Sequence, residues 1–406
     1  MMVVASAIGM LGVSATPDPV QGLEIAQTAR FHPPGAHGFR PLMCRLQRVM
    51  DPYVRRRLIL FLTPVALGCG AADEPDRPPP RPAAPLTPPK VLCAALPAGA
   101  PERPCRPAEE VERWMASPDL EILGTAQTPS GIQGARVLTL RFPGPPAVVF
   151  RAKWRAQSTL SSKNVPRREL VAYAIQKLYL APHDYVVPPT AAHCFPLAMY
   201  RARVLPAAQP SFRDVPCVLG FLSYWLEDVE GLKDAREEGW FASRDDALDD
   251  DLFAENPLYR ESVADMNLLT YLIDHADTHS AQFVIRRDRE APATYSVDNS
   301  MAFGVKKNTR VRVDWSQIQV PALSRRAVER LREASVDRLS SIAELELAGG
   351  GRLVPVASAP RAAEPAGIRW IEGRLVIGMT VDELAMLRER LTRLFLVIDG
   401  GQLKLF

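Results

Sequence analysis

The stretch that decides the fold runs from Tyr271 to Gly304 and reads YLIDHADTHSAQFVI, then RRDREAPAT, then YSVDNSMAFG. It contains two apolar runs with polar residues at their ends. The first run predicts the end of a helix near Ile273. The second predicts a short strand from Tyr295 to Val297. Between them, Phe283 to Ile285 and a charged segment predict a strand and a turn, so the unit is expected to form a hairpin.

Three polar side chains follow these runs at a spacing that fits a phosphoryl-transfer site. Asp277 lies in the loop after the helix, Gln282 follows five positions later, and Asp298 comes after the hairpin. In such a site one Asp orients the attacking hydroxyl, while an amide and a second Asp hold Mg²⁺ on the phosphates. The pattern predicts Asp277 as a catalytic residue and Asp298 and Gln282 as ligands of Mg²⁺ or Mn²⁺.

These residues resemble the catalytic loop and metal-binding Asp of kinase-fold enzymes. The loop can be read as the His275-x-Asp277 of protein kinases, or as the Asp-Arg-His-x-x-Asn of phosphoinositide kinases, here DTHSAQ. Both readings select Asp277. The ending DNSMAFG, which begins at Asp298, is similar to the Asp-Asn-Gly-x-x-Phe-Gly of secretory-pathway kinases, the Golgi casein-kinase and four-jointed enzymes. In the loop, Gln282 replaces the Asn and Thr278 replaces the Arg of these patterns.

A lysine and a glutamate in the N-terminal half extend this resemblance. A strand-like run alternates into Lys153, and sixteen residues later Glu169 opens a predicted helix that continues to Leu178. The segment RELVAY and the later VVPPT resemble a passage of bacterial phosphoinositide-kinase-like and secretory kinases. The resemblance covers about residues 120 to 345. It implies that Glu169 holds Lys153 on the α- and β-phosphates of ATP, whereas a charged helix N-terminus is the alternative.

A glycine-bearing turn precedes this lysine. Residues 128–134 read TPSGIQG and separate strand-like runs at Leu120 to Leu123 and Ala135 to Phe142. Because glycine lets a backbone close over phosphates, Gly131 and Gly134 are candidates for contacting ATP. An ordinary hairpin turn has the same composition, so both interpretations remain open.

The pattern as a whole predicts an α+β, two-lobed protein-kinase-like fold. The N-lobe, residues 108–227, is expected to hold an antiparallel sheet and one key helix, and the C-lobe, residues 228–406, to be mainly helical with a C-terminal extension. Leu197 to Leu205 and Val215 to Trp225 alternate like paired strands. Leu222 to Glu227 would then form the hinge, where adenine bonds to the backbone.

The C-terminal half carries three predicted helices and a predicted terminal hairpin. The helices are expected over Pro257 to Ile273, Ala327 to Leu345 and Val381 to Leu394, the last with Thr380 as its N-cap. The segment Leu396 to Phe406 is expected to form two short strands around its Asp-Gly-Gly.

The N-terminal region is expected to lie outside the folded part. Residues 1–49 show no core-building run and are predicted to be unstructured or an over-extended start. Residues 50–69 hold a basic patch, an apolar run and Cys69, which resembles a lipoprotein signal, although a buried helix is the alternative. Residues 70–107 are proline-rich and predict a disordered linker. These features predict an exported monomer in the bacterial periplasm or on the outer surface, held to the membrane only through lipidated Cys69.

The cysteines fit an exported protein without fixing their pairing. Cys93, Cys105, Cys194 and Cys217 would remain after removal of the signal, and Cys93–Cys105 and Cys194–Cys217 would close the shorter loops. Four free buried thiols are the alternative.

Composition narrows the class of function. The 406 residues are 47% hydrophobic, which supports a large core in one two-lobed domain or two small ones, and the net charge of +3 gives no argument for nucleic acid. The motifs and the composition together leave three hypotheses about the function. The first is an exported kinase that moves the γ-phosphate of ATP to an unknown hydroxyl on a protein, lipid or small molecule. The second is a pseudokinase that binds a nucleotide or partner. The third is a zinc metallohydrolase using His275 and His279.

Overall fold

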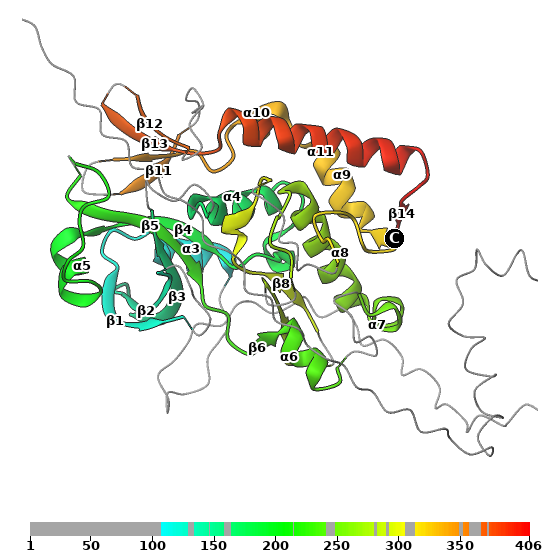
Figure 1. The fold of residues 1–406 in the computed structure, drawn as a ribbon, viewed down its shortest axis with the longest axis horizontal. Coiled ribbons are helices and arrows are strands. Elements are labelled where there is room, and N and C mark those ends of the chain that lie inside the picture. Colours follow the sequence, from blue (N-terminus) through cyan, green and yellow to red (C-terminus); the bar gives the residue numbers. More distant parts are fainter. Residues whose placement is uncertain are drawn as a thin grey trace, which may run out of the picture. The chain divides into compact units, whose positions relative to one another are not determined.

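The structure of the protein is a computed structural model, shown in Figure 1. It describes residues 107–128, 134–145, 147–157, 164–213, 215–240, 248–279, 282–289, 292–304, 313–348, 352–356, 367–371 and 373–406. All of them belong to the unit Arg81–Phe406. Several predictions concern residues outside these ranges and stay predictions. They are the signal segment with Cys69, the proline-rich linker up to residue 106, the Cys93–Cys105 pair and Gly131.

An antiparallel sheet of five strands forms the N-terminal part. Its order is β1-β2-β3-β5-β4. The strands are β1 Glu121–Gln127, β2 Arg136–Phe142, β3 Val148–Ala156, β4 Thr190–Pro196 and β5 Cys217–Tyr224. Along β3, Phe150, Ala152 and Trp154 are fully buried in a hydrophobic cluster. Because neighbouring side chains alternate across a strand, Lys153 and Arg155 point to the other face.

Two helices cover the buried face of this sheet. They are α3, Ala108–Met115, and α5, Leu197–Arg203, and they contribute Trp114 and Tyr200 to the same cluster as β3. The expectation of a strand over Leu197 to Leu205 was wrong. The strand that pairs with β5 is β4, which ends at Pro196. That proline lacks an N–H for the ladder, and the residues after it are good helix formers.

The helix α4, Arg167–Gln176, is buried on almost every side. Ala174 is its only residue that is not fully buried. An element buried all round must pack against neighbours in every direction, so α4 contacts both the sheet and the C-terminal part. The polar residues of its first turn, Arg167, Arg168 and Glu169, are buried as well.

The chain leaves the five-stranded sheet after Tyr224, within the segment predicted as the hinge. It continues into a three-stranded antiparallel sheet, β6-β7-β8. The elements are β6 Val229–Gly231, α6 Leu232–Glu237, β7 Phe283–Arg286 and β8 Thr294–Ser296. The predicted hairpin is therefore confirmed, with β7 and β8 as its strands.

The predicted helix before the catalytic loop is confirmed. It is α8, Pro257–Leu272, and it follows the short helix α7, Asp250–Glu255. The side chain of Asn256 caps α8 by accepting a hydrogen bond from the backbone N–H of Tyr259 at 3.0 Å. Most of its C-terminal half is buried in the main hydrophobic cluster of the molecule.

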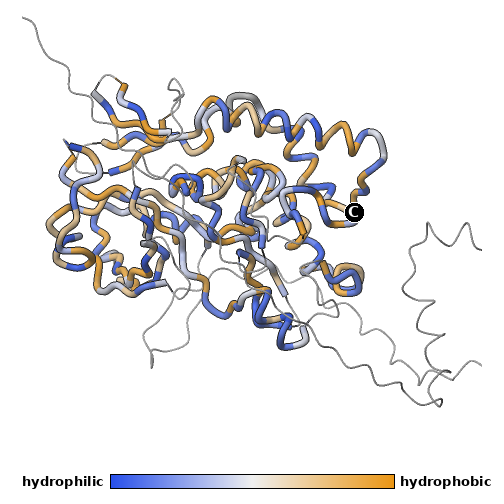
Figure 2. The backbone as a smooth tube through the Cα atoms, viewed as in Figure 1, coloured by the Kyte–Doolittle hydropathy of each residue, from blue (hydrophilic) through white to orange (hydrophobic). Residues whose placement is uncertain are grey.

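The C-terminal segment forms a four-stranded sheet and a long helix. The sheet has the order β11-β10-β13-β12 and is antiparallel. The elements are β9 Ala322–Leu323, α9 Arg325–Glu333, α10 Val336–Ser340, β10 Leu345–Leu347, β11 Leu353–Pro355, β12 Ile368–Ile371, β13 Arg374–Ile377, α11 Val381–Asp399 and β14 Lys404–Leu405. Figure 2 shows polar and apolar residues alternating along α11, as a helix on the edge of a core requires.

Two expectations about this segment were wrong. The helix predicted over Ala327 to Leu345 is two helices followed by β10. The hairpin predicted after Leu396 is instead the last turn of α11 and a single strand, β14, which pairs in parallel with β9. No proline or glycine interrupts α11 before Gly400, so the helix continues through the residues that were read as a strand.

The α+β class, with an antiparallel N-terminal sheet, one key helix and a helical part after it, is confirmed. The boundary at residue 227 between two lobes stays a prediction. Within the described ranges, no helix has both the length and the apolar character that crossing a membrane requires.

Candidate active site

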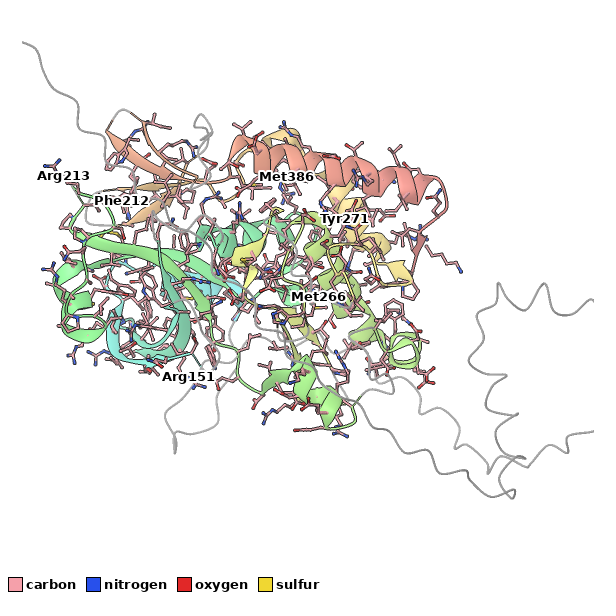
Figure 3. The ribbon with its side chains drawn as sticks, in the orientation of Figure 1. Arg151, Phe212, Arg213, Met266, Tyr271 and Met386 are labelled. Carbon is pink, nitrogen blue, oxygen red and sulfur yellow. A yellow bond between two sulfur atoms is a disulfide. The ribbon has the colours of Figure 1, made fainter. Side chains whose placement is uncertain are left out.

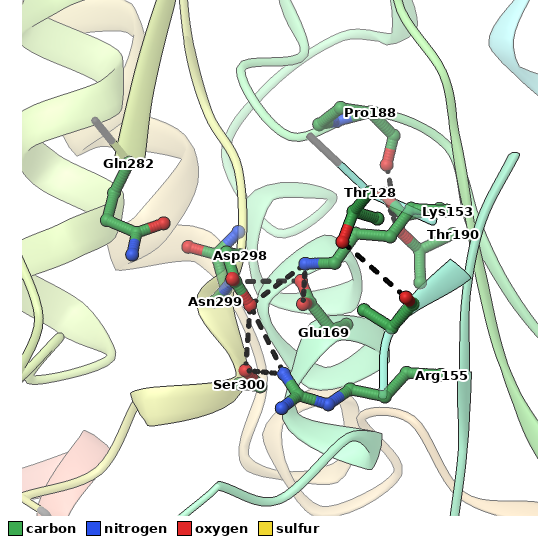
Figure 4. Close-up of polar contacts among 12 residues, drawn as sticks. Thr128, Lys153, Arg155, Glu169, Pro188, Thr190, Gln282, Asp298, Asn299 and Ser300 are labelled. Atoms are coloured by element: carbon green, nitrogen blue, oxygen red, sulfur yellow. Dashed lines mark hydrogen bonds and ion pairs between the residues drawn. The ribbon is translucent and has the colours of Figure 1, made fainter. Parts of the chain in front are cut away.

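Lys153 stands at the centre of the candidate site (Figure 4). Its Nζ lies 3.1 Å from Oε1 of Glu169 and 2.8 Å from Oδ1 of Asp298. The lysine comes from β3, the glutamate from the first turn of α4 and the aspartate from the loop after β8. Three elements distant in sequence thus place one cation between two carboxylates, as the sequence predicted for the first pair.

Glu169 also holds the loop that carries Asp298. Its second carboxylate oxygen, Oε2, accepts a hydrogen bond from the backbone N–H of Asn299 at 2.9 Å. The Asn299 side chain is fixed in turn, because its Oδ1 accepts from Ser296 Oγ at 2.7 Å. Glu169 therefore contacts both the ammonium group of Lys153 and the backbone of the loop that carries Asp298.

Asp298 uses only one of its carboxylate oxygens. Besides the lysine, Oδ1 accepts a hydrogen bond from Ser300 Oγ at 2.9 Å and meets Arg155 Nη1 at 3.5 Å. Oδ2 has no partner within the described part of the chain, and the side chain is 36% exposed. The backbone of Asp298 is left-handed, with φ of 58°, a conformation that costs free energy in a residue with a side chain.

The charges of this cluster shift its pKa values. Burial would raise the pKa of Asp298, but Lys153 and Arg155 outweigh it and hold that pKa well below its usual range. Burial would lower the pKa of Lys153, yet Glu169 and Asp298 raise it. The lysine is therefore cationic and Asp298 anionic at neutral pH, the charges that binding phosphates and a divalent cation requires.

The loop after α8 brings Asp277 and Gln282 together. Gln282 Nε2 donates a hydrogen bond to Asp277 Oδ2 at 3.1 Å, and His279 Nε2 lies 3.5 Å from Asp277 Oδ1. The backbone N–H of Val297 donates to the carbonyl of Gln282 at 2.9 Å, so Asp298 follows directly beside this loop. Figure 4 shows the Gln282 amide turned toward Asp298. Its Oε1 has no partner among the described residues.

His275 has a structural position rather than that of a metal ligand. It is fully buried, and its Nδ1 accepts a hydrogen bond from the backbone N–H of Asp277 at 3.2 Å. Burial lowers its pKa to about 4, so the ring is neutral at pH 7 and supports the loop as an acceptor. Among the described residues, no group of three or more His, Cys, Asp or Glu side chains could hold a metal ion. The geometry thus lends no support to zinc at His275 and His279.

The remaining predicted positions lie at the edges of the site. Gly134 precedes β2 with φ of 75°, which favours glycine, and open space surrounds the position of a Cβ there. The hinge segment is fastened to β3, because Arg151 forms a bidentate ion pair with Glu227 at 2.7 and 2.8 Å. Trp225 extends this contact through its backbone N–H, which donates to the carbonyl of Arg151.

Sequence reasoning missed two residues that contact Asp298. Arg155 and Ser300 both bind Asp298 Oδ1, and Arg155 Nη1 also donates to Ser300 Oγ at 3.1 Å. A signal for Arg155 existed, because a residue two positions from Lys153 on a strand points to the same face. No comparable signal marked Ser300, which lies within the DNSMAFG motif at a position where the secretory kinases have glycine.

Comparisons with known proteins give likenesses of structure alone. One solved structure is described as hydra Fam20 with sugar, at a TM-score of 0.42 and 16% identity, covering 72% of this chain and 88% of that one. The Golgi casein kinase has a TM-score of 0.39 and 11% identity, covering 73% and 78%. The same kinase with Mn/ADP bound has a TM-score of 0.39 and 11% identity, covering 70% and 74%.

No family model matches the chain, and no curated protein matches it. The assignment of chemistry to this site therefore rests on its own residues and their geometry.

The residues present fit a divalent cation held jointly with phosphates. Mg²⁺ in such sites takes one or two carboxylates and completes its coordination with phosphate oxygens and water, so a cage of three protein carboxylates is not needed. Asp298 Oδ2 and Gln282 Oε1 are oxygen atoms of the kind that Mg²⁺ binds, and neither has a competing partner in the described ranges. Lys153, already cationic, stands beside the same carboxylate as a partner for phosphate oxygens.

Proposed function

We propose that the protein is an ATP-dependent phosphotransferase that moves the γ-phosphate to a hydroxyl acceptor. One observation carries the proposal: Lys153 Nζ lies within ion-pair distance of both Glu169 and Asp298. A lysine shared by a helix glutamate and a loop aspartate is what a phosphoryl-transfer site needs to fix nucleotide phosphates beside a cation.

Each residue then has a separate task. Lys153 would bind phosphate oxygens, Glu169 would keep its ammonium in place, and Asp298 would offer Oδ2 to the cation. Asp277 would orient the acceptor hydroxyl, with its own carboxylate held by Gln282. A bound Mg²⁺ or Mn²⁺ would supply charge neutralisation on the phosphates. The rate enhancement would come from positioning and electrostatic stabilisation rather than from a covalent intermediate.

We further propose that this reaction takes place outside the cytoplasm. Support comes from the disulfide between Cys194 on β4 and Cys217 on β5, whose Cα atoms are 5.5 Å apart. Disulfides persist in oxidising compartments and are rare in the cytosol. The signal-like segment at residues 50–69 points the same way, as it did in the sequence.

The experiment that tests the proposed activity compares the full chain with Asp298→Asn. ATP turnover and melting temperature are measured with and without Mn²⁺ or Mg²⁺. Metal-dependent turnover is expected in the wild type and a loss of about 100-fold or more in the variant, because the carboxylate ligand is gone. Asp399→Asn, an exposed aspartate at the end of α11 that pairs with Arg332, is the matched control and should retain turnover.

Turnover that survives Asp298→Asn would remove this residue from the site. A pseudokinase remains the second candidate function. It is favoured by Gln282 in place of Asn and by Arg155, a second cation beside the oxygen that Lys153 already occupies. Nucleotide-dependent stabilisation without turnover in the wild type would establish that second function instead.

A further inference from the structure

The two arginines that precede Glu169 bind a carboxylate from the far end of the chain. Arg167 makes a bidentate ion pair with Glu383 of α11, with both contacts at 2.8 Å. Arg168 Nε donates to Oε1 of the same glutamate at 2.7 Å. The three side chains are buried, with exposed fractions of 1%, 7% and 3%. One anion from α11 thus pairs with two buried cations in the first turn of α4.

Glu383 is itself held by the helix that carries it. It forms a capping box with Thr380: its Oε2 accepts from the Thr380 N–H at 3.0 Å, and its own N–H donates to Thr380 Oγ1 at 3.1 Å. Burial opposes ionisation of this carboxyl, but Arg167 and Arg168 outweigh it and hold the pKa of Glu383 below its ordinary value. The carboxylate is consequently a fixed anion with both oxygens occupied.

The same network reaches the loop that carries Asp298. Arg168 Nη1 donates to the backbone carbonyl of Ala302 at 2.6 Å. Glu169, the next residue of α4, accepts from the Asn299 N–H. Adjacent residues at the start of α4 therefore bind the loop at two points. Arg168, which makes the first of these contacts, is also bound to Glu383.

A glycine lets the C-terminal chain approach Arg167 closely. Gly367 has φ of +62°, and a Cβ there would lie 2.2 Å from Arg167 Nε and 2.3 Å from the carbonyl of Gly378. The backbone N–H of Gly378 donates to the Gly367 carbonyl at 2.9 Å. The chain before β12 is therefore packed against the arginine as tightly as a bare backbone permits.

The C-terminal segment is fixed to both parts of the fold. Its sheet packs on a cluster that includes Leu170 of α4 and the Cys194–Cys217 disulfide. Phe212, beside that sheet in Figure 3, meets the ring of Trp370 edge-on. At the other end, Arg390 Nη1 donates to the carbonyl of Tyr271 of α8 at 2.7 Å. The segment thus spans from α4 and the N-terminal sheet to the helix before the catalytic loop.

We propose that Glu383 is a positioning residue, through which the C-terminal segment holds α4 where Glu169 reaches Lys153 and the Asp298 loop. The consequence for activity rests on the proposed function, while the mechanical coupling does not. Kinase-fold enzymes need the lysine–glutamate pair assembled before they act. Here the chain's own C-terminal segment supplies a contact that holds the helix of that pair.

The test compares Glu383→Gln with Glu344→Gln in the full chain. Glu344 is an equally buried glutamate that pairs with Arg369 of β12 inside the C-terminal sheet, so its loss also leaves a buried arginine without its anion. Amide hydrogen exchange is measured in α4 and in residues 298–304. We expect exchange there to accelerate at least about tenfold in Glu383→Gln and to change little in Glu344→Gln.

Kinetics give the second measurement wherever the wild type turns over ATP. In Glu383→Gln, kcat should fall on the order of 10- to 100-fold with a smaller change in KM for ATP, because a displaced Glu169 misplaces the phosphates. Glu383→Asp, which keeps the charge, should recover part of the loss. Glu344→Gln should lower the melting temperature and keep kcat.

Arg168→Lys guards against a variant that does not fold. It keeps the buried charge but cannot reproduce both the Glu383 and the Ala302 contacts, so it should show the same exchange pattern in milder form. Equal exchange changes in the Glu383 and Glu344 variants would overturn the proposal, because the effect would then be general destabilisation. An inactive wild type with α4 loosened only by the Glu383 and Arg168 variants would refute the proposed function and leave the coupling standing.

Discussion

At the scale of single residues, the site depends on how each charge is shared. Asp298 gives one oxygen to Lys153, Arg155 and Ser300, while its other oxygen contacts none of the residues that the structure describes. Periodicity predicted the strand, the helix start and the hairpin end that carry Lys153, Glu169 and Asp298, and the resemblance to kinase motifs singled out these three residues. Arg155 stands on the same strand face as Lys153, but alternation alone does not tell a site residue from an exposed arginine.

The first prediction at this scale concerns the length of the Gln282 side chain. Its Nε2 reaches Asp277 at 3.1 Å, and Asn at this position would be one methylene shorter. We expect Gln282→Asn to lower turnover about tenfold, because the hydrogen bond to a charged carboxylate is lost. Steady-state kinetics beside Gln319→Asn, a change at an exposed contact with the carbonyl of Asp314, would measure it. Higher turnover would mean that the site is not built around the longer side chain.

A buried histidine away from the site gives a pH prediction. His193 contacts the carbonyl of Met115 through Nδ1 at 3.2 Å, and burial lowers its pKa to about 4. Between pH 6.5 and 4 the unfolded chain binds a proton that the folded protein does not, so folding loses up to about 1.4 kcal/mol per pH unit from this group.

The variant His193→Asn lacks this penalty. Its stability relative to the wild type should therefore improve as pH falls through that window, as urea unfolding at pH 7, 5.5 and 4.5 would show. A constant difference between the two proteins across these pH values would contradict the prediction.

At the scale of elements, packing overrode the local pattern after β4. The apolar runs that predicted α4, α8 and the β7–β8 hairpin are long or clearly bounded, and the structure contains all three. Leu197 to Leu205 alternates like a strand, yet β4 had already supplied the pairing that β5 needed, and the chain turned into α5 after Pro196. Periodicity over so short a run does not separate these outcomes.

The prediction at this scale concerns the close packing of β5 against β3 at Gly220. A Cβ at Gly220 would lie 2.4 Å from the carbonyl of Arg155 and 2.5 Å from the ring of Trp154. Gly220→Ala should therefore force β5 away from β3 and cost on the order of 1–3 kcal/mol of unfolding free energy. Gly124→Ala on β1, where nothing lies within 4 Å of the Cβ position, is the control. Denaturant unfolding of both variants decides the matter, and equal stabilities would refute it.

At the scale of the whole molecule, the C-terminal segment could not be predicted. Its strands are two to four residues long, and Arg167 and Glu383 are 216 positions apart. No local pattern connects residues so distant, and a buried arginine looks in sequence like a solvated one. The fold class could be predicted because the motif residues stand at characteristic spacings. The contacts that join the C-terminal segment to α4 could not be predicted.

The prediction at this scale concerns the free energy of unfolding without the Cys194–Cys217 disulfide. Cys194 and Cys217 are 23 positions apart, and the bond restricts the unfolded chain. Replacing both cysteines by alanine should lower the free energy of unfolding by about 3 kcal/mol, mainly by freeing that loop. Chemical denaturation of the double variant would measure this. Stability unchanged from the oxidised wild type would show that the bond contributes nothing.

The position of that disulfide has a practical consequence. Both cysteines are 4% exposed and pack with Leu345, Leu353 and Ile368 of the C-terminal sheet. A small thiol reagent in solution can attack the sulfur atoms only after this sheet has lifted from β4 and β5. The rate at which dithiothreitol reduces the native protein would thus time the detachment of the C-terminal segment, with no label attached and no knowledge of the substrate.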